Sequence, residues 1–153
     1  MAIQIVTRPP SNQNRYDVFW SGDPAFVQDS GEEHARKLER ARETGDWSEL
    51  LIAGVTPTKF VCRQVPGELK RRIMDRFQPN RIGERELDAL LVRIAVVDVV
   101  NLGDFKIAWE ADDDWGRLAT NDLPNLLDEY APGAVADLAV QIFNRMMGLS
   151  GKS

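Results

Sequence analysis

The acidic run Asp112, Asp113 and Asp114 is the cluster of side chains best suited to binding a metal ion. An EF-hand loop needs acidic ligands at alternating positions, a glycine at position six and a glutamate at position twelve. Counted from Asp112, Gly116 occupies position five and Leu123 position twelve, so the pattern fails. A solvated acidic turn is the better interpretation, with a loose divalent-cation site as the alternative. We expect no metal or other cofactor.

Single copies of histidine and cysteine restrict nucleophilic and acid-base chemistry. His34 lies in a charged stretch, which predicts a surface position and provides no partner for a catalytic triad. Cys62 lies in an apolar run, which predicts a buried thiol of low reactivity. No internal disulfide can form from one cysteine.

Asp98 and Arg93 are charged residues inside the most apolar stretch of the chain. A buried carboxylate is costly unless it is paired, so we expect Asp98 to contact an arginine such as Arg93 or a helix N-terminus. A catalytic acid is the alternative, but no second carboxylate is placed beside it. The sequence therefore predicts a protein that is not an enzyme, with no catalytic residues.

Composition narrows the classes of partner. The chain has 153 residues and a net charge of −5, which fits one domain and disfavours a nucleic-acid-binding protein. The first ten residues, MAIQIVTRPP, lack the basic and apolar regions of a secretory signal. No apolar run is long enough to span a bilayer. We therefore expect a cytoplasmic protein that does not bind nucleic acid or membranes.

The stretch 84–100 (ERELDALLVRIAVVDVV) predicts the central element of the fold. Apolar residues occur on nearly every helical face, as in a helix buried in the middle of a domain. The β-branched residues at 96–100 leave a strand as the alternative for its second half. We predict a mainly α fold: one helical domain around a central buried helix at 84–100, with a few short strands in its N-terminal half.

The remaining elements follow from periodicity and turn residues. Residues 1–14 predict an N-terminal arm or strand with a proline-rich hinge, 15–148 the helical domain, and 149–153 a flexible tail. The arm and the next strand are also compatible with a small hairpin. Helices are predicted at 31–44, 47–53, 66–77, 122–129 and 134–147. Strands are predicted at 15–20 and 59–65, and a short strand or extended segment at 105–109.

Candidate partner-binding residues come from three features. The last predicted helix has a broad apolar stripe, which could form a groove for a partner helix: Val135, Leu138, Ile142, Phe143 and Met146. A basic helix could contact acidic partner segments through Lys70, Arg71 and Arg76, although a solvated face is the simpler interpretation. Trp109 and Trp115 are candidate anchors, with pinning of loops to the core as the alternative.

Two stretches resemble the tail assembly chaperones of long-tailed (siphovirus-like) bacteriophages. Residues 56–65 (TPTKFVCRQV) form a strand-like segment followed by a basic helix. In residues 105–127 (FKIAWEADDDWGRLATNDLPNLL), a Trp-Glu pair precedes an acidic turn and a capped helix with paired leucines. The residues that carry the match are Trp109, Glu110, Asp114, Gly116, Asn121, Leu126 and Leu127.

The resemblance implies a small, largely helical, non-enzymatic protein of the host cytoplasm that binds the tape-measure and tail-tube proteins during virion assembly. A second copy of the chain is a further candidate partner. The alternatives are a structural component of the phage virion and an inhibitory interaction module that blocks a host factor, both motivated by the proline-hinged arm at 1–14. An enzyme is the third alternative, with Asp98, Glu110 and the run at 112–114 as its candidate acids.

Overall fold

The computed structural model describes residues 4–6 (backbone), 14–76 and 84–148. Within these ranges, five α-helices and one 3-10 turn form: α1 (Glu32–Thr44), η1 (Ser48–Leu50), α2 (Gly67–Arg76), α3 (Arg85–Ala95), α4 (Asp122–Tyr130) and α5 (Ala134–Met146). The strands are β1 (Gln4–Val6), β2 (Arg15–Val18), β3 (Lys59–Arg63), β4 (Val96–Val100), β5 (Trp109–Asp112) and β6 (Gly116–Ala119). The prediction of a mainly helical fold is therefore wrong, because the protein is a mixed α/β protein.

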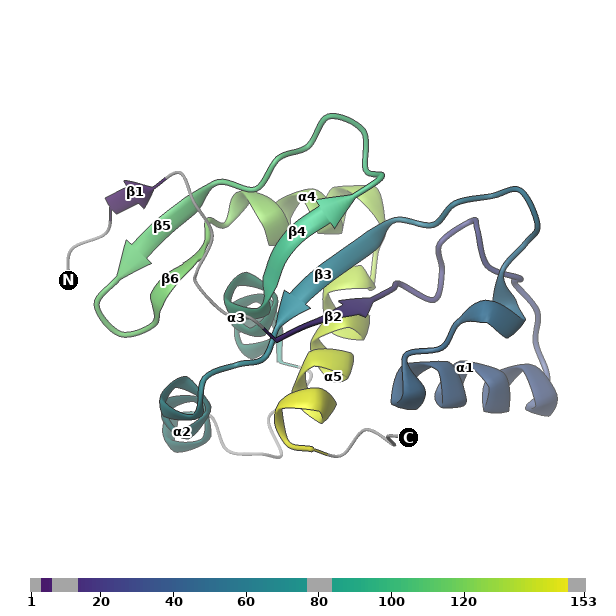
Figure 1. The fold of residues 1–153 in the computed structure, drawn as a ribbon, viewed down its shortest axis with the longest axis horizontal. Coiled ribbons are helices and arrows are strands. Elements are labelled where there is room, and N and C mark those ends of the chain that lie inside the picture. Colours follow the sequence, from purple (N-terminus) through teal and green to yellow (C-terminus); the bar gives the residue numbers. More distant parts are fainter. Residues whose placement is uncertain (1–3, 7–13, 77–83, 149–153) are drawn as a thin grey trace.

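The strands form two antiparallel three-stranded sheets, β1-β5-β6 and β2-β3-β4 (Figure 1). In the first sheet, Val6 lies opposite Trp109, so the N-terminal segment is held by a strand from the distant second half of the chain. An N-terminal hairpin is excluded, since β1 and β2 belong to different sheets. Strands β4, β5 and β6 lie in the second half of the chain, which corrects the expectation that strands gather in the N-terminal half.

The predicted central helix at 84–100 is two elements. Helix α3 ends at Ala95, and Val96 has an extended backbone with φ −74° and ψ 122° that begins β4. Valine, branched at Cβ, fits a pleated strand better than a helix. Strand β3 supplies the partner that makes this choice favourable: Cys62 pairs with Val96 and Val61 with Asp98, with a bulge between the two pairs. The strand alternative for this segment is thus confirmed.

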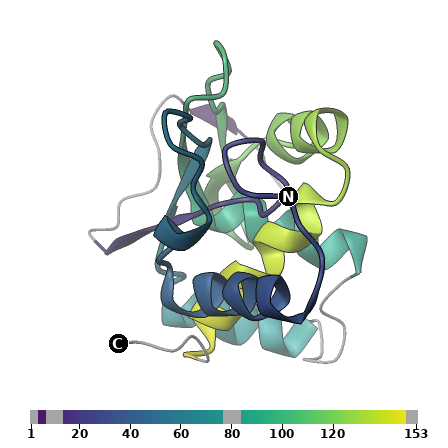
Figure 2. The same cartoon turned by 90° about the vertical axis from the view of Figure 1, so that its right-hand side faces the viewer.

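The sheets form one layer and the larger helices the other. In Figure 2 the strands lie mainly on the upper left, α4 (light green) lies at the upper right, and α5 (yellow) runs from right of the centre towards the bottom of the view. Helices α3 and α5 pack against each other, and α3 also contacts β6. The centre of the core is formed by fully buried side chains from these elements, including Phe60, Leu91, Ile94, Leu138 and Ile142. The apolar periodicity of α5 is therefore satisfied inside the protein.

A small lobe, residues 19–58, has its own apolar cluster. Phe26, Ala41, Trp47 and Leu50 are buried there. The rings of Phe26 and Trp47 have centroids 4.9 Å apart, and Phe19 meets Phe26 edge to face at 5.8 Å. Such ring pairs contribute about 0.5–1.5 kcal/mol each beyond the area they bury. Aromatic packing therefore stabilises a part of the chain that has little regular structure apart from α1.

Polar contacts join the small lobe to the main core. The carboxylate of Asp137 on α5 accepts hydrogen bonds from the Ser21 backbone N–H and the Arg42 Nε, both at 3.0 Å. The buried carboxylate of Asp23 accepts from the Thr58 backbone N–H at 3.0 Å, at the start of the segment leading into β3. Asp137 thus ties the lobe to α5, whereas Asp23 orders the end of the lobe that leads into β3.

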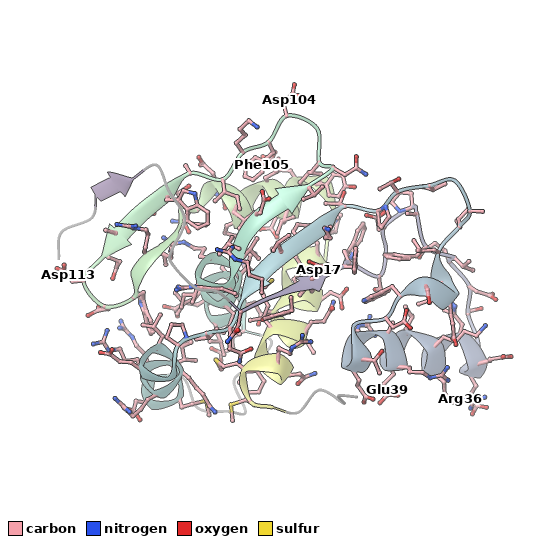
Figure 3. The ribbon with its side chains drawn as sticks, in the orientation of Figure 1. Asp17, Arg36, Glu39, Asp104, Phe105 and Asp113 are labelled. Atoms are coloured by element: carbon pink, nitrogen blue, oxygen red, sulfur yellow. The ribbon has the colours of Figure 1, made fainter. Side chains whose placement is uncertain are left out.

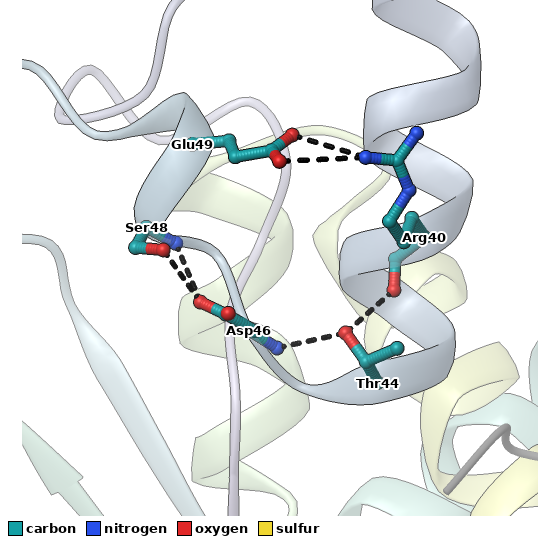
Figure 4. Close-up of polar contacts among 5 residues, drawn as sticks. All are labelled: Arg40, Thr44, Asp46, Ser48 and Glu49. Carbon is teal, nitrogen blue, oxygen red and sulfur yellow. Dashed lines mark hydrogen bonds and ion pairs between the residues drawn. The ribbon is translucent and has the colours of Figure 1, made fainter. Parts of the chain in front are cut away.

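The junction between α1 and η1 is a chain of local hydrogen bonds (Figure 4). Thr44 Oγ1 donates to the Arg40 carbonyl at 2.8 Å, and the Asp46 carboxylate accepts from Ser48 Oγ at 2.7 Å and the Ser48 backbone N–H at 3.0 Å. These bonds from Ser48 lower the pKa of Asp46. Arg40 Nη1 lies 3.3 Å from Glu49 Oε1. Because the groups are exposed, this junction shapes the turn more than it stabilises the fold.

Several predicted boundaries change. The predicted helix at 31–44 begins at Glu32 and is ended by Gly45 in the left-handed conformation (φ 81°), whereas the predicted helix at 47–53 is reduced to η1. Of the two alternatives for 105–109, the strand is misplaced, because pairing with β1 and β6 begins only at Trp109. The predicted hinge falls within residues 7–13 and the tail at 149–153, both outside the described residues.

Candidate functional site

A pocket of about 390 Å³ lies between α2, α3 and the β5–β6 hairpin. Figure 1 shows these elements on the same side of the molecule. We call it the arginine pocket, because guanidinium groups from two helices line it. The lining residues are Arg76, Arg85, Glu86, Ala89, Leu90, Arg93, Asp112, Trp115 and Asn121. Its volume falls in the range of pockets that bind small ligands or single side chains.

The hairpin wall of the pocket is a turn organised by Asp112. Its Oδ1 accepts hydrogen bonds from the backbone N–H groups of Asp114 at 2.8 Å and Trp115 at 3.2 Å. Gly116 follows with φ +72°, a conformation that favours glycine. Figure 3 shows Asp113 at the outer end of this hairpin. The acidic run is therefore the tip of a hairpin, and its geometry turns the Trp115 side chain into a buried position.

The inner wall is fixed by Arg93 of α3. Its Nε donates to the Ala119 carbonyl at 2.7 Å, and its Nη2 lies 3.0 Å from Glu110 Oε1. Both side chains of the ion pair are largely buried, with 18% and 10% exposed. Arg93 therefore holds helix α3 against both strands of the hairpin, and its partner is Glu110 instead of the predicted Asp98.

A second buried arginine supports the same edge of the sheet. Arg63 of β3 donates from Nε to the Ile94 carbonyl at 2.9 Å and from Nη2 to the Arg117 carbonyl at 3.4 Å. Burial, and to a lesser extent the nearby Arg15, lowers the pKa of Arg63 to about 10. Alternate carbonyls of an edge strand point away from its partner strand. Arginine side chains from β3 and α3 thus satisfy carbonyl groups of β6.

The outer arginines of the pocket are more exposed. Arg76 of α2 lies 3.9 Å from Asp114, with side chains 60% and 47% exposed. Arg85 of α3 pairs with Asp128 of α4, and both side chains are again mostly or partly exposed. Exposed pairs of this kind contribute about 0–1 kcal/mol. These guanidinium groups can therefore exchange or share their partners at little cost.

The structure brings Arg76 and Trp115 together in the arginine pocket, although they were predicted from unrelated features. Lys70 and Arg71 lie on the same helix as Arg76 but do not line the pocket, and Arg71 is exposed. Trp109 is buried in the core, which fits the alternative that tryptophans pin loops to the core and not the prediction of an exposed anchor. The sequence reasoning missed Arg85 and the inward position of Arg93. Their one local signal in the sequence was that Arg85 and Arg93 stand eight residues apart on one helix, a spacing that places both on the same helical face.

The expected apolar groove on the last helix is not exposed. Val135, Leu138, Ile142 and Met146 are buried in the core, and Phe143 packs partly buried against it. The reason is that α3 lies along this face of α5, so the apolar stripe is covered by the chain itself. Sequence periodicity identified the apolar face correctly but did not show that another helix covers it.

Exposed aliphatic side chains gather instead in the small lobe. Val27, Leu51, Ile52 and Val55 are each 40–43% exposed, and we call them the exposed aliphatic set. Their backbone segments are neighbours, because Val27 N–H donates to the Leu50 carbonyl and Ile52 N–H to the Ala25 carbonyl, both at 2.8 Å. The sequence signal that could have revealed them is the apolar run LIAGV at 51–55.

The remaining reactive groups have structural environments. Cys62 is completely buried, as predicted, and burial raises the pKa of its thiol. Burial also raises the pKa of Tyr16, whose ring lies 4.3 Å from the Arg145 guanidinium. His34 lies partly exposed on α1. Asp98 was expected to be buried, but it is exposed on β4 and accepts a hydrogen bond from the Val99 N–H at 2.9 Å.

In the described part of the chain, no group of three or more His, Cys, Asp or Glu side chains is arranged to hold a metal ion. None of the described helices combines the length and apolarity that crossing a membrane requires. Comparison with family models, with curated proteins and with solved structures finds no match to this chain.

Proposed function

We propose that this protein is a non-enzymatic phage tail assembly chaperone that binds the tape-measure and tail-tube proteins in the host cytoplasm. The resemblance of residues 56–65 and 105–127 motivates the proposal. The residues that carry the second match lie within one unit, from β5 through β6 to α4. The client-binding surface, however, is not the apolar face of α5, because that face is buried.

The observation that carries the proposal is the exposed aliphatic set. A folded chain of this size gains from burying such side chains, yet Val27, Leu51, Ile52 and Val55 remain about two-fifths exposed on neighbouring segments. Burying one aliphatic side chain at an interface contributes on the order of 1 kcal/mol. A surface of this kind suits the apolar seam of coiled-coil-prone segments, which is what a chaperone for tape-measure proteins must cover.

Charged residues near the exposed aliphatic set favour a client segment of a particular charge. A small cavity of about 130 Å³ beside Val27 is lined by Asp29, Glu33 and Glu49 together with His34 and Lys37. Carboxylates outnumber the permanent cation, so a client helix with lysine or arginine beside its apolar seam is favoured. The buried aromatic cluster beneath the set keeps its backbone in place before the client arrives.

Co-expression with the tape-measure protein of the same phage tests the proposal. We expect the client to stay soluble and to co-elute with the chaperone in size-exclusion chromatography. The double variant Leu51→Ser/Ile52→Ser should weaken the complex about tenfold or more, since it removes two aliphatic contacts. Val140→Ser is the matched control, because Val140 is 38% exposed but lies on α5.

The proposal fails if the wild-type protein neither solubilises the client nor forms a complex. It also fails if the double variant binds as well as the control, because the surface would then be misassigned. Recovery of the protein in stoichiometric amounts from purified particles would favour a virion component instead.

A further inference from the structure

The arginine pocket is separate from the exposed aliphatic set, and the proposed function leaves its chemistry unused. We propose that this pocket binds a carboxylate group presented by a protein segment, together with the apolar side chain next to it. This inference rests on the proposed client-binding function and specifies a second contact with the client.

The inner end of the pocket offers a preorganised donor. Arg93 is held by the Ala119 carbonyl and by Glu110 through its Nε and Nη2 atoms. Its Nη1 donates to no acceptor among the described residues. A guanidinium fixed on one side and open on the other binds a carboxylate with little loss of side-chain freedom.

The outer end offers two further guanidinium groups. Arg76 and Arg85 come from different helices and pair with Asp114 and Asp128, which do not line the pocket. Both pairs are solvent-exposed, so an incoming carboxylate competes with weak contacts. The pocket therefore presents three cationic groups, and the acidic partner of each lies outside the pocket lining.

The acidic lining residues are partly compensated by the backbone. Asp112 Oδ1 already accepts hydrogen bonds from the N–H groups of Asp114 and Trp115. Glu86 lies in the first turn of α3, where the helix N-terminus stabilises a negative charge. The lining therefore holds three guanidinium groups against these two carboxylates, and this excess of positive charge gives the pocket its preference for an anion.

The apolar residues of the lining indicate which kind of molecule presents the carboxylate. The ring of Trp115 and the side chains of Ala89 and Leu90 form an apolar wall beside the arginines. Such a wall contributes nothing to a hydrated inorganic ion, but it does bury an aliphatic side chain next to a carboxylate. The ligand class is therefore an acidic, partly apolar peptide.

Nuclear magnetic resonance titrations that follow the Trp115 indole N–H test this inference on the full chain. The first probe is a blocked peptide of alternating leucine and glutamate, and the second is the same peptide with glutamine in place of glutamate. A third has glutamine with a free C-terminal carboxylate, and the fourth is inorganic phosphate. We expect one of the two carboxylate peptides to bind: the glutamate peptide if the pocket takes a side-chain carboxylate, or the free-carboxylate peptide if it takes a chain end. The blocked glutamine peptide should bind at least tenfold more weakly.

The variant Arg76→Gln/Arg85→Gln should weaken binding of the acidic peptide at least tenfold, and the loss should parallel that caused by added salt. Arg71→Gln is the matched control, because Arg71 lies on the same helix but outside the pocket. Arg93 is not varied, because it also holds the hairpin. Unchanged circular dichroism and urea midpoints show that each variant is folded.

Equal binding of the blocked glutamine peptide would overturn the inference, as would phosphate binding as tightly as the acidic peptide. An equal loss in Arg71→Gln would also overturn it, because the whole basic helix would then be responsible. If the tape-measure complex forms but no carboxylate peptide binds, only the pocket assignment fails. If peptides bind but no client complex forms, only the proposed function fails.

Discussion

Removal of the Asp137 carboxylate should loosen the small lobe from the main core. In Asp137→Ala, the Ser21 backbone N–H and the Arg42 Nε each lose an acceptor at 3.0 Å. Hydrogen bonds to a charged group contribute about 1.5–3 kcal/mol each. Because the Arg42 side chain is 31% exposed, water recovers part of this loss. We therefore expect the variant to lose about 2–3 kcal/mol.

Hydrogen exchange followed by mass spectrometry measures where the loss falls. If the lobe opens as a unit, peptides covering residues 19–30 and 45–58 should exchange roughly 30–150 times faster, which corresponds to about 2–3 kcal/mol. Asp137→Asn keeps one carbonyl acceptor, so its effect should be intermediate. Urea unfolding of the same variants gives the global free energy for comparison.

Glu49→Ala is the matched control in the same lobe. Its ion pair with Arg40 has a similar distance of 3.3 Å, but both side chains are 56% exposed. We expect a change within about 0.5 kcal/mol and no change in exchange. If Asp137→Ala behaves like this control, the lobe is held by its other contacts, such as the hydrogen bond from Gln141 Nε2 to the Phe19 carbonyl, and the assigned role of Asp137 is refuted.

Three further predictions concern the core and the hairpin. Burial raises the pKa of Cys62, so the neutral thiol contributes to the free energy of unfolding fully below the unfolded-state pKa near 9, and this contribution declines as the pH rises above 9. In urea unfolding between pH 8 and 10.5, the free energy of unfolding should therefore fall less in Cys62→Ala than in the wild type. The wild-type thiol should react with a disulfide reagent only after unfolding. Glu110→Gln should cost about 1–3 kcal/mol in urea unfolding, because it leaves the largely buried charge of Arg93 without a carboxylate. Gly116→Ala, at φ +72°, should cost about 1–2 kcal/mol. Gly67→Ala should stabilise the protein by about 0.5 kcal/mol, because Gly67 is the first residue of α2, does not have a left-handed φ and leaves open space for a Cβ atom. The opposite order of thermal midpoints would contradict the backbone argument.

Much of the local structure was predictable from short-range patterns. The ends of α1 and α5, the extended backbone of β3 and the burial of Cys62 all follow from periodicity and from helix-ending glycines. These features depend on residues a few positions apart, which is the range that a sequence pattern reports. Of the candidate site, Arg76 and Trp115 were named as single residues, but their proximity was not predictable, because 39 positions separate them in the chain (115 − 76).

The amino-acid sequence by itself determined which faces are apolar, where the single thiol lies and which turns need glycine. Tertiary structure decided what covers each face and which polar groups meet. Val96 became the start of a strand because β3 lay beside it, Arg93 paired with Glu110 because the hairpin folds against α3, and the apolar stripe of α5 was buried by α3. Strand pairing, ion pairs and helix packing depend on distant segments, so only the folded chain could specify them.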